Sequence, residues 1–288
     1  MDIRSKKWLR PLCIVVAVLL VLGVIGMIVS NYLRYPGIYK DPVSSEKIET
    51  RKDYVLIAHR GLSCAAPENT IPAFEEAGKA GFEYAECDIQ LTKDEVWVVS
   101  HDTNLKRMTG FDGEIADMKL KEVRSHPVTH GSHASKYDNV VTPTLEEYLQ
   151  TCQDYGLTPV IELREDHADW PYETLLDLLT QYSFRETAIL ISFHEADLKA
   201  VRKLDEDIFM MYLTNEEITE ETADLVHEIG NCGIDASYKS LTKTSEDILK
   251  ALRKAEIEVA VWTVDSPKKA ANAVELGADW VTTNRITP

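Results

Sequence analysis

Five residues between positions 59 and 101 of this 288-residue chain have side chains suited to the chemistry of phosphate esters. Two are imidazoles, which can pass protons onto and off ester oxygens. One is a guanidinium, which binds phosphate through several N–H donors. Two are carboxylates, which suit a hard divalent cation. The residues are His59, Arg60, Glu86, Asp88 and His101. They predict a metal-assisted reaction at phosphate, provided that the fold brings them together.

The two carboxylates lie on one predicted strand, residues 84–91. Because side chains alternate along an extended chain, Glu86 and Asp88 project from the same face and Cys87 from the other. Neighbouring carboxylates are costly to bury unless a cation lies between them, and oxygen ligands favour Mg²⁺ or Ca²⁺. An isolated pair of this kind would equally fit one solvated carboxylate and one paired with Lys93.

Two further predicted strands position the histidines. The apolar run 54–58 predicts a buried strand that ends at His59, and Gly61 allows the backbone to turn there. The run 96–99 follows residues 84–91 after a link too short for a parallel crossover, so the two runs predict an antiparallel hairpin. The hairpin brings His101 back towards the first strand, and the two histidines then flank the carboxylate pair.

The stretch resembles the signature of the glycerophosphodiester phosphodiesterase family. Six motifs stand in the family's order and spacing: H-R-G from His59, P-E-N-T from Pro67, E-x-D from Glu86, L-T-K-D from Leu91, H-D from His101 and R-x-T-G from Arg107. A thinner resemblance continues through Glu162, Ser192-Phe193 and Trp262-Thr263-Val264 and covers about five sixths of the chain. Single motifs of this kind are weak, but six in order are a strong signal.

The resemblance implies a metal-dependent phosphodiesterase that hydrolyses glycerophosphodiesters to glycerol phosphate and an alcohol. One divalent cation, Mg²⁺ or Ca²⁺, is expected on Glu86, Asp88 and Glu162. His59 and His101 are expected to share the acid and base roles. Which histidine does which stays open; we favour His101 as the acid, because the hairpin carries it to the far side of the carboxylate pair.

The resemblance also implies a substrate-binding set. Arg60 and Arg164 are expected to bind the phosphate, although the family usually has lysine where this chain has Arg164, so a fork-shaped donor replaces a compact ammonium. Phe193 and Trp262 are expected to form an aromatic wall beside the glycerol moiety. A role in core packing fits these two aromatic residues nearly as well.

Strands and helices alternate along the rest of the chain. Strands are expected at 54–58, 84–91, 159–163, 188–193, 208–213, 233–238, 258–264 and 279–283, each but the last followed by a helix. This pattern predicts a (β/α)₈ TIM barrel with a short β-hairpin insertion after the second strand and with the chemistry at the C-terminal ends of the strands. The eighth helix is expected to be missing or very short. An open doubly wound sheet would usually carry a glycine-rich phosphate loop, which is absent.

The N-terminal segment 11–33 is uncharged and would span about 35 Å as a helix at about 1.5 Å per residue. It predicts a transmembrane helix and a single-pass protein of the cell membrane. Basic residues in 1–10 place that end in the cytoplasm and the domain, 54–288, outside, after a stalk at 34–53. A cleaved signal peptide is the alternative, but the apolar part is long and no A-x-A-like site follows.

The composition limits the partners. A net charge of −17 and a pI near 4.9 exclude nucleic acid, which needs a basic surface. The five cysteines form no C-x-x-C pair, so neither a zinc site nor a disulfide scaffold is indicated. The expected partners are a small or lipid-derived glycerophosphodiester and the membrane, while the oligomeric state stays open. Alternatives are a phospholipase D-like enzyme acting on lysolipids, a hydrolase of cell-wall polyglycerol phosphate and a non-catalytic binding barrel.

Overall fold

Eight parallel strands close into a barrel in the computed structural model, which describes Gly23 and residues 40–164 and 169–288. The strands pair in the order β2-β10-β9-β8-β7-β6-β5-β3, and a β2–β3 pairing joins the two ends of that order. They are β2 (Val55–Ala58), β3 (Tyr84–Leu91), β5 (Thr158–Leu163), β6 (Ile189–Ser192), β7 (Phe209–Thr214), β8 (Cys232–Ser237), β9 (Val259–Trp262) and β10 (Trp280–Thr283). The predicted TIM barrel is confirmed.

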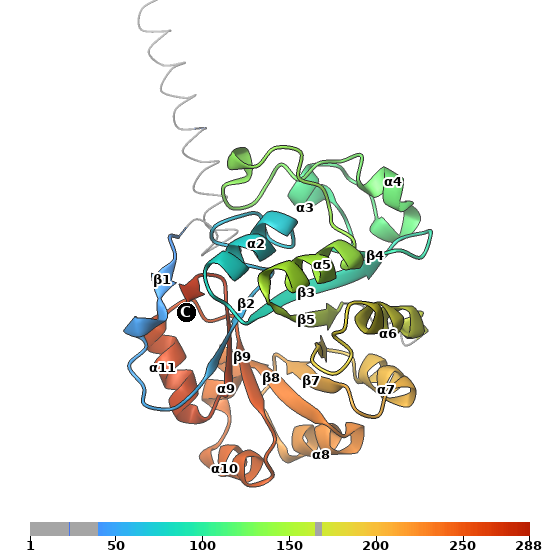
Figure 1. Ribbon diagram of the computed structural model, residues 1–288. Coiled ribbons are helices and arrows are strands. Elements are labelled where there is room, and N and C mark those ends of the chain that lie inside the picture. The colour runs from blue at the N-terminus through green and yellow to red at the C-terminus, as the bar shows by residue number, and fades with distance from the viewer. Residues whose placement is uncertain (1–22, 24–39, 165–168) are drawn as a thin grey trace, which may run out of the picture. The chain divides into compact units, whose positions relative to one another are not determined.

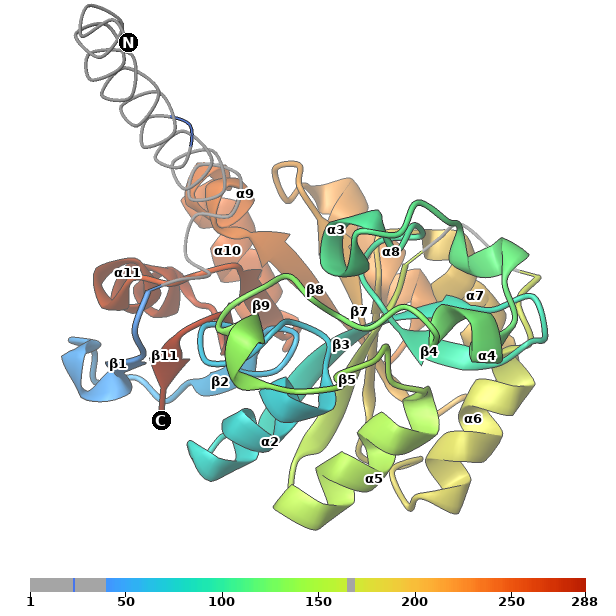
Figure 2. The same ribbon diagram turned by 90° about the horizontal axis from the view of Figure 1, so that it is seen from above.

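Helices connect consecutive strands and surround the barrel (Figures 1 and 2). They are α2 (Ile71–Lys79), α5 (Leu145–Tyr155), α6 (Tyr172–Gln181), α7 (Glu195–Leu204), α8 (Glu220–Ile229), α10 (Glu246–Lys254) and α11 (Pro267–Leu276). Because strand side chains alternate, the barrel has two cores. On β3, Ala85, Cys87 and Ile89 pack towards the helices, whereas Tyr84 packs in the interior. The same alternation turns Glu86 and Asp88 inward.

The predicted hairpin is formed by β3 and β4 (Trp97–Val99), which pair antiparallel with Ile89 opposite Val99. The segment that follows contains the short helices α3 (Lys106–Thr109) and α4 (Leu120–Val123) and lies beside β4 in Figure 1. It has a small core of its own, made of Val98, Leu105, Ile115, Met118 and Val123. This core fixes the hairpin, and therefore the chain that carries His101.

One short helix and one pair of short strands differ from the sequence-based expectation. A short helix, α9 (Tyr238–Lys243), lies between β8 and α10 where no helix was predicted. After β10 the chain forms β11 (Ile286–Thr287), which pairs in parallel with β1 (Val43–Ser44). Both pieces are too short to be recognised by periodicity. Residues 40–288 therefore form one compact unit, which includes part of the segment predicted as a stalk.

The membrane prediction is corrected. In the part of the chain that the structure describes, no helix is long and apolar enough to cross a membrane. The helix α5, for example, has 11 residues and at about 1.5 Å per residue covers roughly 16 Å of a hydrocarbon core about 30 Å thick. That finding contradicts the predicted localisation as a single-pass protein of the cell membrane and leaves the membrane partner unsupported. The segment 11–33 itself lies outside the described residues, apart from Gly23.

The turn after β2 brings the chain close to α2. Arg60 and Gly61 both have left-handed backbone conformations, with φ of +57° and +73°. The N–H of Gly61 donates to the carbonyl of Glu86 (3.2 Å), and the N–H of Leu62 donates to that of Ala73 (2.9 Å). A Cβ at position 61 would lie 2.5 Å from the carbonyl carbon of Ala73. Only glycine fits this turn without movement of the backbone.

We expect Gly61→Ala to destabilise the protein by about 3 kcal/mol or more, because left-handed strain of roughly 1–2 kcal/mol adds to a clash of roughly 1–3 kcal/mol. Gly81→Ala is the matched control: its φ is +87°, but its Cβ would meet nothing within 4 Å. It should cost only the strain. Urea unfolding of the full chain measures both variants, and equal losses would contradict a close approach at Gly61.

Candidate active site

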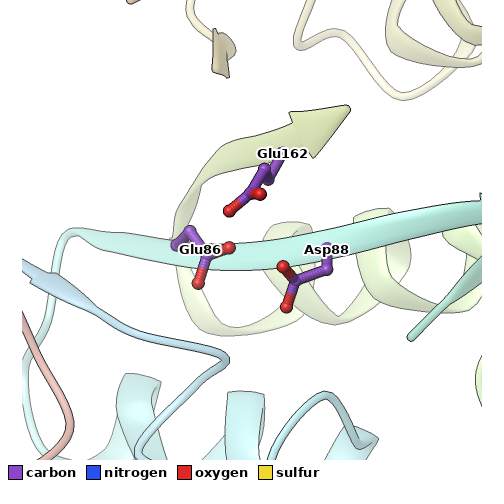
Figure 3. A group of neighbouring side chains, drawn as sticks. All are labelled: Glu86, Asp88 and Glu162. Atoms are coloured by element: carbon purple, nitrogen blue, oxygen red, sulfur yellow. The ribbon is translucent and has the colours of Figure 1, made fainter. Parts of the chain in front are cut away.

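Three carboxylates from two neighbouring strands converge (Figure 3). Glu86 and Asp88 project from β3, and Glu162 projects from β5, where it lies opposite Asp88 in the strand register. One oxygen of each lies within 4.8 Å of the others. The exposed fractions of the three residues are 2%, 0% and 7%. This carboxylate triad is the cluster predicted from the sequence, and it is brought together by parallel pairing of the two strands.

The triad has oxygens that the protein does not satisfy. Oε1 of Glu86 and Oδ1 of Asp88 are buried and accept no hydrogen bond. The other Glu86 oxygen, Oε2, accepts from the backbone N–H of Arg60 at 2.8 Å. Buried polar atoms without partners are costly unless a ligand satisfies them. An all-oxygen donor set of this kind fits a hard divalent cation.

Repulsion within the triad shifts the pKa values of its members. Burial raises the pKa of Glu86 well above its ordinary value, and the charges of Asp88 and Glu162 raise it further. Burial and the charge of Asp88 raise the pKa of Glu162 to about 7. Burial would raise the pKa of Asp88 too, but the charge of Arg60, with those of His101 and Arg164, lowers it to about 2. The negative charge is therefore concentrated on Asp88, and a cation would displace protons from the other two.

Both predicted phosphate-binding arginines lie against carboxylates. Arg60 donates through Nη1 to Glu68 at 2.8 Å, and its Nε lies 3.1 Å from Oδ2 of Asp88. Arg164 contacts Glu162 through Nη1, and its Nε lies 3.7 Å from Oδ1 of Asp88 and donates to the carbonyl of His101. The two guanidiniums thus flank the triad, and each has N–H groups beyond these contacts.

The two histidines are held at Nδ1 by different partners. Nδ1 of His59 lies 2.8 Å from Oδ1 of Asn284, an uncharged amide. Nδ1 of His101 lies 2.6 Å from Oδ1 of Asp102, a carboxylate. Burial and the charge of Arg60 lower the pKa of His59 to about 4, although the bond to Asn284 opposes them. In both rings Nε2 is left as the atom that can exchange a proton with a substrate.

An ionic chain links His101 to the arginine beside the triad. The second oxygen of Asp102 accepts from Nε of Arg107 at 2.5 Å. Nη2 of Arg107 donates to Glu68 at 2.7 Å, and the same Glu68 oxygen accepts from Arg60. Burial would raise the pKa of Asp102, but bonds from His101 and Arg107 outweigh it and hold that pKa below its usual range. The chain of contacts keeps Asp102 ionised beside His101.

Phe193 and Trp262 meet edge to face, with ring centroids 5.6 Å apart. Both are partly exposed and pack against the interior core that includes Ile191 and Leu213. Nε1 of Trp262 donates to the backbone carbonyl of Asp235. The pair therefore lies over the barrel interior, where the predicted aromatic wall requires it, and a packing role and a binding role are compatible there.

Some residues around the site were missed from the sequence. Glu68, Asn69, Asp102 and Arg107 lie in the motifs that carried the resemblance, but their partners are not encoded locally. Asn69 lies just before α2, and its Nδ2 donates to Asp88 at 2.7 Å. Further such residues are Asp235, whose Oδ1 is buried without a hydrogen-bond partner, and Asp265 and Asn284 near the C-terminus.

We expect Glu86→Gln to remove both the repulsion and the cation. A pKa raised in the folded state means that this carboxyl lowers the free energy of unfolding as the pH rises above about 4.5, its ordinary value. In chelator, the variant should therefore match or exceed the wild type in stability at pH 8. Addition of Mg²⁺ or Ca²⁺ should raise the melting temperature of the wild type only. Glu83→Gln, on an exposed residue, is the control, and a cation-induced shift that persists in Glu86→Gln would exclude Glu86 as a ligand.

Known relatives resemble this chain in sequence. A model of the glycerophosphoryl diester phosphodiesterase family matches residues 59–287. A glycerophosphodiester phosphodiesterase of Bacillus altitudinis is 30% identical over 232 residues, which cover 80% of this chain and 94% of the relative. The uncharacterized protein YqiK of Bacillus subtilis (strain 168) is 30% identical over 231 residues, with the same coverage.

Solved structures of similar fold lead to the same family. A glycerophosphodiester phosphodiesterase from Thermotoga maritima is 26% identical, with a TM-score of 0.66, and the match covers 82% of this chain and 96% of that one. An Oleispira antarctica phosphodiesterase in complex with the product sn-glycerol-3-phosphate has a TM-score of 0.73 at 24% identity, over 84% and 96% of the two chains, and supports the fold. With a family model that spans about four fifths of its length, this chain belongs to the glycerophosphoryl diester phosphodiesterase family.

Proposed function

We propose that this protein, a phosphoric diester hydrolase by its family, hydrolyses glycerophosphodiesters to glycerol phosphate and an alcohol with the help of one divalent cation. The observation that carries the proposal is the carboxylate triad, which has two buried oxygens without hydrogen-bond partners. It is accompanied by two histidines that are each held at Nδ1. The named activity of the Bacillus altitudinis relative and the bound glycerol phosphate of the Oleispira antarctica phosphodiesterase agree with this substrate class.

The proposed cation ligands are Glu86, Asp88 and Glu162, and their oxygens suit Mg²⁺ or Ca²⁺. A cation bound there would neutralise charge that develops on the phosphate oxygens. Arg60 and Arg164 flank the triad and offer further donors to the same phosphate. Phe193 and Trp262 would border the glycerol moiety, because they lie over the barrel interior beside the strand ends.

The proposed division of the proton transfers follows from the partners of the histidines. His59 is held by an uncharged amide and has a pKa of about 4, so it is neutral near pH 7 and can accept a proton through Nε2. Nδ1 of His101 lies against the carboxylate of Asp102, so its Nε2 is directed away from that partner and is available for the other proton transfer. We therefore assign His59 as the base that takes a proton from the attacking hydroxyl, and His101 as the acid that protonates the leaving oxygen.

Hydrolysis should require the cation. Full-length protein treated with chelator should lose phosphodiesterase activity on glycerophosphocholine, glycerophosphoethanolamine and glycerophosphoglycerol, and Mg²⁺ or Ca²⁺ should restore it, because only a cation satisfies the triad. Glycerol phosphate release is the readout. Full activity after exhaustive chelation would exclude metal dependence. Lysophospholipids and polyglycerol phosphate belong in the same panel, and a strong preference for either would replace the proposed substrate class.

The two histidines should respond differently to the leaving group. His59→Ala and His101→Ala should each lower kcat on the order of a hundredfold or more, the range for a positioned proton donor or acceptor. A nitrophenyl phosphodiester needs little protonation of its leaving oxygen, so it should rescue His101→Ala and not His59→Ala. His126→Ala, in the loop beyond the hairpin, is the control. Equal rescue of both variants, or rescue of His59→Ala alone, would refute the assigned roles.

A further inference from the structure

We propose that Asn284 and Asp265 act as a positioning pair that fixes the His59 ring in the tautomer with hydrogen on Nδ1. The inference rests on the proposed function only in so far as His59 is taken to be the base. It extends the site to two residues near the C-terminus of the sequence. Asn284 directly follows β10, which pairs with β2, and Asp265 follows β9, which pairs with β10.

The orientation of the Asn284 amide is determined by Asp265. The two side-chain heavy atoms of the amide differ in chemistry: Nδ2 only donates and Oδ1 only accepts. One of them lies 2.9 Å from Oδ2 of Asp265, and a carboxylate oxygen only accepts. That atom must therefore be Nδ2, because the flipped amide would place two acceptor oxygens against each other. Oδ1 then faces His59.

The orientation of the amide determines the tautomer of His59. Oδ1 of Asn284 can only accept, so Nδ1 of His59, at 2.8 Å, must donate and must carry the hydrogen. Oγ of Ser63 donates to the same oxygen at 2.9 Å, which agrees with this assignment. A neutral imidazole carries one hydrogen, so Nε2 keeps its lone pair. His59 needs this lone pair to act as a base. In the other tautomer Nε2 would carry the hydrogen and could not accept a proton.

Asp265 is itself held in place by the backbone that follows β10. Its Oδ1 accepts from the N–H of Asn284 at 2.8 Å and from the hydroxyl of Thr283 at 3.2 Å. The N–H of His59 donates to the carbonyl of Thr283 at 2.9 Å. The backbone of His59 is thus bonded to the last residue of β10, and the side chain of Asp265 is bonded to that residue and to the next one, Asn284. The orientation is a property of the barrel and does not depend on a flexible loop.

Burial and the charge of Arg60 keep the ring neutral, and the uncharged amide adds no charge that would oppose them. The charged groups that act on His59 are Arg60, Asp88 and Glu68, and only Arg60 disfavours the imidazolium. A carboxylate placed at position 284 would oppose Arg60 and favour the charged ring. The two residues therefore have different tasks. The carboxylate of Asp265 holds the Asn284 amide in one orientation, and the amide orients the His59 ring without placing a negative charge next to it.

Ring ¹⁵N chemical shifts of His59 in the full chain test the inference without any substrate. The wild type should show hydrogen on Nδ1, and Asn284→Ala should show a mixture of the two tautomers. In the same variant kcat should fall on the order of tenfold or more, part of the roughly 10²–10⁴ that a positioned base supplies, with KM within about twofold. Asn272→Ala, on the exposed side of α11, is the control. Unchanged tautomer and kcat in a folded Asn284→Ala protein would overturn the inference.

The exchange of the pair, Asp265→Asn with Asn284→Asp, gives a second test that keeps the hydrogen bonds. The amide at 265 can donate to the carboxylate at 284, which still accepts from Nδ1 of His59, so the tautomer is retained while the charge moves next to the ring. The pH at which kcat/KM falls to half on the acid side of its profile should then rise by about one unit or more. An unchanged pH at that point would overturn the inference. A wild type inactive on every diester would refute the proposed function alone, because the tautomer would still be measurable.

Discussion

The repulsion among three buried carboxylates is the constraint on which the site depends. Glu86, Asp88 and Glu162 have to lie within 4.8 Å of one another in a barrel that excludes water from them. Such a cluster persists only with compensation. Arg60 and Arg164 supply part of it by flanking the triad, and proton uptake by Glu86 and Glu162 supplies another part. A divalent cation would neutralise the negative charge that remains.

The ion pairs that balance the charge of the triad continue outward as a network. Arg60 contacts both Asp88 and Glu68, and Glu68 also binds Arg107, which in turn binds the carboxylate that holds His101. The carboxylate triad and the proposed acid are therefore connected through alternating charges. Removal of one member would leave its neighbour buried and unpaired, which costs more than the pair contributes. This explains why the P-E-N-T and R-x-T-G motifs accompany the residues of the reaction.

The two histidines show how one type of side chain can receive two roles. Both are fixed at Nδ1, so both direct Nε2 away from the partner. The partner of His101 is a carboxylate and that of His59 is an amide, so the two rings have different electrostatic surroundings. The substitution of arginine for the family's usual lysine at position 164 fits the same scheme, since its fork contacts two carboxylates and a backbone carbonyl together.

The sequence by itself determined the barrel, the hairpin and the carboxylate triad. Alternation along residues 84–91 placed Glu86 and Asp88 on one face, and the short link after them required an antiparallel return, both of which are local properties of an extended chain. It did not determine the membrane assignment, which was drawn from hydropathy alone and is contradicted by the described helices. It also missed β1, β11 and α9, which are too short for periodicity to reveal.

Only the tertiary structure decided the partners of the reacting groups. Asn284 lies 225 residues from His59 in sequence and reaches it because closure of the barrel sets β10 beside β2. Asn69, equally suited to capping a helix, binds Asp88 instead, because the turn after β2 brings it to the triad. Side-chain types and spacing specify which groups are available and which face they share. Hydrogen-bond partners depend on which strand ends meet, and that is a property of the closed sheet.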